Sequence, residues 1–121
     1  MAQDWKKMEM YKKAHQLVLE IYAVAKKLPD GEQEYGIGAE ICQNAMQIPA
    51  TIVRGSVFEE SEFREHLEEA RLTLRTVDMH LTIMHRLGFI TESERDRLLK
   101  LGEEVRQLLI QRIERRKVAK A

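Results

Sequence analysis

The chain has 121 residues and carries 20 basic and 20 acidic side chains, so its formal net charge is zero. That balance excludes a uniformly basic nucleic-acid coat protein and an acidic disordered tail protein. Hydrophobic residues make up 44% of the chain, and there are only six Gly and two Pro, which predicts one globular, helix-rich domain over residues 1–121.

The first half of the chain predicts two helices, over residues 5–28 and 35–53. Apolar residues recur in the first at three- and four-residue spacing: Tyr11, Ala14, Val18, Ile21, Ala25 and Leu28. Pro29 and Gly31 end this helix. The second has a stripe of Ile37, Ile41, Ala45, Ile48 and Ile52. Pro49 lies inside it and predicts a bend or a break near Ala45.

The second half predicts helices over residues 59–87 and 92–117. The third helix has the most regular pattern: Phe63, Leu67, Ala70, Leu74, Val77, Leu81 and Met84. Ser56 with Glu59, and Thr91 with Glu94, have the spacing of capping boxes, and Gly88 suits the residue after a helix end. Four helices with short connections predict an all-α, antiparallel, up-down-up-down four-helix bundle.

The expected cellular compartment of the protein is inferred from features that the sequence does not contain. Cys42 is the only cysteine, so no intrachain disulfide can form. The start of the chain lacks an apolar signal-peptide region, and the longest uncharged run, residues 41–53, is too short to span a membrane. We expect a soluble, cytoplasmic protein.

The sequence contains no catalytic or metal-binding pattern. None of the four histidines has a Glu three residues before it, as a di-iron bundle site requires. Gly36-Ile37-Gly38 is a lone pair of glycines without a preceding strand, and Cys42 has no cation beside it in sequence. We predict a protein that is not an enzyme and that has no metal and no cofactor.

The charges are unevenly distributed. Residues 57–70 contain six Glu and one Arg, whereas residues 106–121 contain six basic residues and one Glu. One interpretation is a basic patch that contacts phosphates. The other is internal neutralisation, in which Arg112, Arg115 and Arg116 lie beside Glu62, Glu65 and Glu69 of the preceding helix.

Further cations share helix faces in the first and third helices, where they could equally form an ordinary solvated surface. The candidate nucleic-acid contacts are Lys6, Lys13, Arg71, Arg75, Arg112, Arg115, Arg116 and Lys117. The first and third helices also carry apolar residues outside their main stripes, which predicts a subunit interface unless the protomer core is unusually wide. The candidate interface residues are Leu17, Val24, Leu72, Met79 and Ile83.

The order of several short motifs resembles a known family over roughly residues 5–113. These motifs are Tyr11-x-x-Ala14-His15, Ile21-Tyr22, Leu28-Pro29, Tyr35-Gly36, Glu40-Ile41, Ile48-Pro49 with Ile52 and Gly55, Glu62-Phe63, Ala70 with Leu74, and Leu87-Gly88-Phe89-Ile90. They resemble the four-helix-bundle proteins encoded within intervening sequences of bacterial 23S rRNA genes.

The resemblance implies protomers that assemble into a ring, with a homopentamer expected. The family is similar to the accessory variability protein of diversity-generating retroelements, a pentameric barrel that binds nucleic acid and a reverse transcriptase. We therefore expect a non-catalytic oligomer that associates with structured RNA or DNA through phosphate contacts. A protein-interaction adaptor that recruits a partner enzyme, such as a reverse transcriptase, is the alternative.

Overall fold

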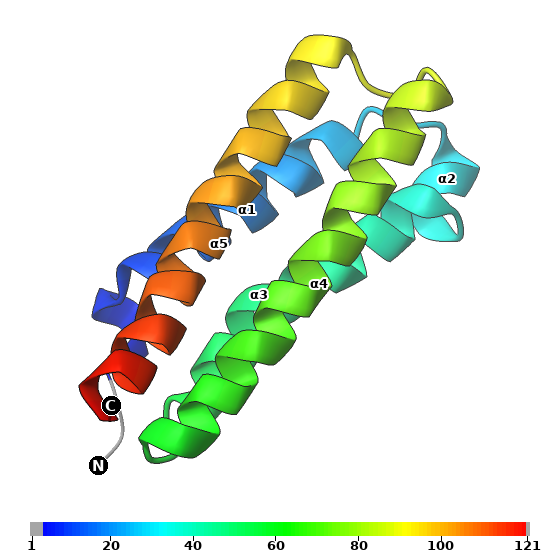
Figure 1. Ribbon diagram of the computed structural model, residues 1–121. Coiled ribbons are helices and arrows are strands. Elements are labelled where there is room, and N and C mark those ends of the chain that lie inside the picture. Colours follow the sequence, from blue (N-terminus) through cyan, green and yellow to red (C-terminus); the bar gives the residue numbers. More distant parts are fainter. Residues whose placement is uncertain (1–3, 121) are drawn as a thin grey trace.

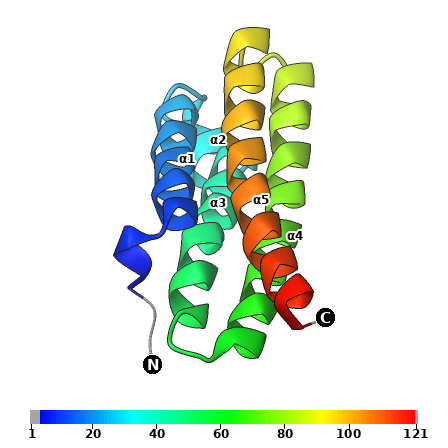
Figure 2. The same ribbon diagram turned by 60° about the vertical axis from the view of Figure 1, so that its left-hand side comes forward.

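The computed structural model describes the backbone of residues 4–120 and the side chains of residues 4–114. The elements, in chain order, are η1 (Trp5–Lys7), α1 (Glu9–Ala25), α2 (Asp30–Glu34), α3 (Ile37–Gly55), α4 (Glu60–Arg86) and α5 (Glu92–Lys120). The four long helices lie side by side as a bundle (Figures 1 and 2), and α2 sits at the end where α1 passes into α3. No strand occurs within residues 4–120.

One contiguous core fills the bundle. It contains the stripes of all four long helices, including the fully buried side chains of Phe63, Leu67, Leu74 and Leu109. α1 packs against α3 and α5, and α4 also packs against α3 and α5. Each long helix therefore has two neighbours and one outward side. No helix within residues 4–120 combines the length and the apolar character needed to cross a membrane.

The expected first helix, residues 5–28, is divided at Met8. Residues 5–7 form the 3-10 turn η1, and Met8 is extended before α1 begins at Glu9. α1 ends at Ala25, where the amide of Gln33 donates to the carbonyl of Lys26 at 2.9 Å. That side chain comes from α2, a short helix that the sequence analysis did not predict.

Pro49 lies inside α3, which runs without interruption from Ile37 to Gly55. The helix is therefore not interrupted at Pro49, and what remains of the expectation is a bend or a lost hydrogen bond near Ala45. Because proline has no N–H, the Ala45 carbonyl lacks its helical donor, and a bend at this point stays a prediction. Pro49 is buried in the protomer, and it lines the groove that α3 forms with α1.

The connection from α3 to α4 depends on a close contact at Gly55. A Cβ atom on Gly55 would lie 2.6 Å from the Cβ of His66, so only glycine lets the end of α3 approach the start of α4 so closely. The predicted capping box at this point is wrong. Ser56 donates its hydroxyl to the carbonyl of Val53 at 2.6 Å, and the cap residue Glu59 makes no side-chain cap bond.

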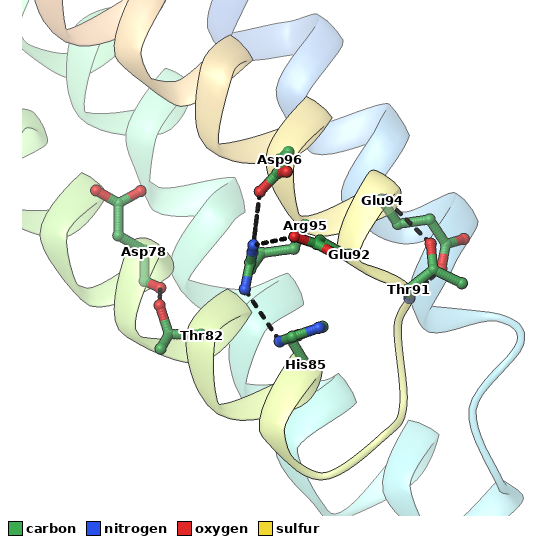
Figure 3. Close-up of polar contacts among 8 residues, drawn as sticks. All are labelled: Asp78, Thr82, His85, Thr91, Glu92, Glu94, Arg95 and Asp96. Atoms are coloured by element: carbon green, nitrogen blue, oxygen red, sulfur yellow. Dashed lines mark hydrogen bonds and ion pairs between the residues drawn. The ribbon is translucent and has the colours of Figure 1, made fainter.

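The connection from α4 to α5 has the predicted local structure. Gly88 has a φ of 80°, and the Phe89 N–H donates to the Met84 carbonyl at 2.9 Å, as in a Schellman motif. The predicted capping box of Thr91 and Glu94 is confirmed (Figure 3). The Thr91 N–H donates to Glu94 at 2.9 Å, and the Glu94 N–H donates to the Thr91 hydroxyl at 3.0 Å.

Candidate interaction surfaces

Arg112 on α5 is held against α4. Its guanidinium donates to both carboxylate oxygens of Glu60, at 3.1 and 3.2 Å, and lies 5.1 Å from the centre of the Phe63 ring. The predicted partners Glu62, Glu65 and Glu69 are therefore wrong for Arg112. Glu60 lies on the side of α4 that faces α5, whereas a residue two positions later points about 200° away from it.

Other cations of α5 are paired in the same way. Arg106 donates to Asp78 of α4 at 2.6 Å, and Arg97 lies 3.1 Å from Glu20 of α1. At the start of α5, Arg95 donates to His85 of α4 at 3.1 Å and pairs with Asp96 (Figure 3). These pairs join α5 to both of its neighbours and neutralise most of the arginines in the part of α5 whose side chains the structure describes.

The candidate nucleic-acid contacts divide into three groups. The first group is already paired with carboxylates. Lys13 lies 3.2 Å from Glu104 and Arg71 lies 2.8 Å from Glu68, and Arg112 pairs with Glu60 as described above. Lys6 and Arg75 are exposed and have no carboxylate partner among residues 4–114. Lys6 lies 5.5 Å from the centre of the Trp5 ring. The remaining three candidates, Arg115, Arg116 and Lys117, have side chains outside the described part of the chain.

Two of the candidate interface residues are not at the surface. Leu17 and Val24 are buried in the protomer core, so the expectation that they form an outward apolar face is wrong. α1 packs against both α3 and α5, and the two contacts together cover a wider arc of α1 than its main stripe occupies. The exposed apolar residues of α1 are instead Leu19 and Tyr22.

The other three candidate interface residues form an exposed row on α4. The exposed fractions of Leu72, Met79 and Ile83 are 63%, 50% and 39%. Their spacings of seven and four residues place them along one helix face, opposite the core. We call these three residues the α4 stripe. No other described part of the chain covers them, because their exposure is that of the complete protomer.

A second apolar surface lies between α1 and α3. This α1–α3 groove has a volume of about 510 Å³ and is lined mainly by Trp5, Val18, Leu19, Met46, Pro49 and Val53. Leu19 and Met46 on its rim are 59% and 44% exposed. The core stripes of the sequence do not indicate the groove, although the outward position of Leu19 on a helical wheel is a signal that could have revealed it.

Aromatic and basic side chains close one end of the groove. The Trp5 and Tyr11 rings meet edge to face with their centres 4.8 Å apart, and the Tyr11 hydroxyl lies 3.1 Å from Nδ1 of His15. Arg54 of α3 also lines this end and is held by the hydroxyl of Thr51 at 3.0 Å. The groove is thus apolar along its length and basic at the end formed by η1 and the end of α3.

Comparisons with known proteins assign the family. The family described as 23S rRNA-intervening sequence protein matches residues 6–111. The chain belongs to this family. A protein of unknown function from the S23 ribosomal protein family of Bacteroides thetaiotaomicron has a similar fold, with a TM-score of 0.78 and 20% sequence identity. The match covers 86% of this chain and 97% of the other. No curated protein matches the sequence.

The described residues of this 23S rRNA-intervening sequence protein contain no cluster of three or more His, Cys, Asp and Glu side chains that could hold a metal. His80 is buried between α4 and α3, where its Nε2 lies 3.4 Å from a carboxylate oxygen of Glu40. Burial raises the pKa of the Cys42 thiol, which disfavours the reactive thiolate. Both side chains therefore fit a structural role.

Proposed function

We propose that this protein is a non-catalytic homo-oligomer, a ring of antiparallel four-helix protomers that holds structured RNA or DNA through phosphate contacts. The family resemblance favours five protomers. The observations that carry the nucleic-acid role are the exposed, unpaired cation Lys6 of η1 and the run of basic residues 115–117 in the last turns of α5.

Lys6 supports this role because it is exposed and no carboxylate neutralises it within the described part of the chain. Side chains of this kind bind phosphate oxygens and release counterions from the nucleic acid. Such contacts position a nucleic acid without reading its sequence. We therefore expect binding that depends weakly on sequence and that weakens steeply as salt rises.

The test is fluorescence polarisation of a labelled RNA hairpin and a labelled DNA duplex over a series of salt concentrations. Replacing Arg115, Arg116 and Lys117 by Ala should reduce the slope of log affinity against log salt by up to about three, near one for each lost phosphate contact. Lys13→Ala is the matched control, since Lys13 already pairs with Glu104, and its slope should equal that of the unmodified protein. An unchanged slope in the triple variant, or no binding of either probe, contradicts the phosphate-contact role.

A protein-interaction adaptor, whose ring recruits a partner enzyme such as a reverse transcriptase, is the second candidate. The pairing of Arg106 and Arg112 with carboxylates of α4 favours it, because it leaves the described part of α5 nearly neutral toward an outside ligand. The polarisation experiment separates the two functions. An adaptor keeps its oligomeric state and binds neither probe at physiological salt.

A further inference from the structure

We propose that the α4 stripe of one copy packs into the α1–α3 groove of the next copy. This head-to-tail contact rests on the oligomer proposed above and assigns the two surfaces that build it. Both surfaces are apolar, and both are open in the protomer. Each protomer has one α4 stripe and one α1–α3 groove. The two lie on different sides of the bundle, so the stripe of a protomer cannot pack into the groove of the same protomer.

The shapes of the two surfaces match a known type of recognition. An amphipathic helix commonly binds by laying a row of apolar residues into a groove between two other helices. Leu72, Met79 and Ile83 form such a row, and the groove between α1 and α3 has walls of Leu19 and Met46. Burying large aliphatic side chains on both sides removes apolar surface from water, which is the main favourable term in stable association.

At the end of the bundle where α4 begins, the charges beside the two surfaces are complementary, whereas the exposed cation Arg75 lies farther along the stripe. Glu65 and Glu69 flank the beginning of the stripe, are exposed, and form no ion pair with another described side chain. Arg54 lies at the basic end of the groove and has no carboxylate partner among the described side chains. The start of α4 follows the end of α3 after a short turn, so the acidic and basic groups lie at the same end of the bundle. A rotation about an axis along the bundle keeps these ends together and brings unlike charges into contact.

The contact is heterologous, because each copy contributes two different surfaces. A dimer formed in this way still has one free stripe and one free groove. Association then continues until a ring closes or a filament grows. The outward face of α5 carries charged and polar side chains such as Lys100, Glu103 and Gln107, which suits a face that stays in water.

The groove favours a protein segment over a nucleic acid. Apart from Tyr11, His15 and Arg54, its lining is apolar, so it offers few hydrogen-bond partners for a base or a sugar. Trp5 is the only tryptophan in the chain and lies in the groove. Its emission therefore reports directly on whatever covers this surface.

The experiment uses two variants that each lose one surface. The groove variant carries Leu19→Asp and Met46→Asp, and the stripe variant carries Leu72→Asp and Met79→Asp. All four side chains are exposed, so both variants should keep the unfolding midpoint of the unmodified protein within a few degrees. The control variant carries Gln107→Asp and Gln111→Asp on the exposed side of α5 and should assemble normally.

Light scattering should give a mass near 14.2 kDa for each surface variant alone. An equimolar mixture should give a complex of two chains and no larger species, because it contains one working stripe and one working groove. The Trp5 emission should shift to shorter wavelength on mixing, as the groove loses contact with water.

Surface variants that assemble like the control would overturn this interface while leaving an oligomeric function intact. A mixture that stays monomeric would overturn it as well. An unmodified protein that is itself monomeric would reject both the interface and the proposed ring. Quenching of Trp5 in the stripe variant by a single-stranded oligonucleotide, without pairing on mixing, would assign the groove to nucleic acid instead.

Discussion

The outward faces of α4 and α5 differ, although both helices are long, rich in charge and packed into the same core. α5 directs Arg106 and Arg112 sideways into ion pairs with α4 and presents polar groups to water. α4 contributes the carboxylates of those pairs but presents the apolar side chains of Leu72 and Met79. The difference shows that the position of a charge around its helix, more than the number of charges, decides whether the outward face of the helix is polar or apolar.

Substitutions on the buried and the exposed side of α4 should differ most in their effect on stability. Phe63 is fully buried, so Phe63→Ala should lower the free energy of unfolding by about 3–5 kcal/mol. Leu72→Ala should leave the protomer's stability within about 0.5 kcal/mol, since Leu72 is 63% exposed in the protomer. Chemical denaturation of both variants, measured at a concentration where the protein is monomeric, gives the two values. Similar losses at both positions would contradict the assigned faces.

The ion pairs of α5 give the next largest effect. Arg112→Ala should cost about 2 kcal/mol, because a partly buried carboxylate loses a bidentate partner and Phe63 loses its contact with the guanidinium. Arg97→Ala is the matched control. Arg97 forms a more exposed pair with Glu20, so its removal should cost about 0.5 kcal/mol or less. Equal costs for the two variants would show that Arg112 is not held as the structure places it.

The capping box at the start of α5 should contribute less than the Arg112 pair. Thr91→Ala removes the hydroxyl that accepts from the Glu94 N–H and should lower the free energy of unfolding by about 1 kcal/mol. Thr91→Ser keeps the hydroxyl and serves as the control, with stability near that of the unmodified protein. A loss as large in the Ser variant would assign the effect to the methyl group instead of the cap.

Glu94 gives this region a dependence on pH. A hydrogen bond from Lys27, followed by the Thr91 N–H, holds the pKa of Glu94 below its ordinary value of 4.5. The folded state therefore binds the proton less readily than the unfolded state, and the stability from Glu94 is present above pH 4.5 and is lost as the pH falls through the lowered pKa. Glu94→Gln should reduce the acid sensitivity of the unfolding free energy. An unchanged pH profile would contradict the lowered pKa.

Apolar periodicity predicted the long helices well, because three- and four-residue spacing directly reflects which side of a helix is buried. It failed where contacts between distant segments decide the outcome. α2 is stabilised by Gln33 reaching back to the carbonyl of Lys26, and such a bond has no periodic signal. The same limit explains Arg112, whose partner Glu60 depends on the rotation of α4 about its own axis.

The α4 stripe could be predicted from the sequence, whereas the α1–α3 groove could not. The α4 stripe could be recognised because Leu72, Met79 and Ile83 stand on the side opposite a very regular core pattern. Leu17 and Val24 also lie outside the main stripe of their helix, but they are buried in the protomer. α1 packs against α5 as well as α3, and the apolar spacing of α1 alone does not indicate this second contact. The groove needs residues from η1, α1 and α3 together, so no single stretch of sequence indicates it.

The most direct test of the central claim is the mass of the unmodified protein in solution. A stripe and a groove on every copy predict that light scattering at micromolar concentration gives a stable multiple of 14.2 kDa, with fivefold expected from the family resemblance. That mass should fall to the value of one chain when the stripe carries Leu72→Asp and Met79→Asp. A mass near 14.2 kDa for the unmodified protein would contradict the account, because the exposed apolar residues of α4 would then be left without a partner.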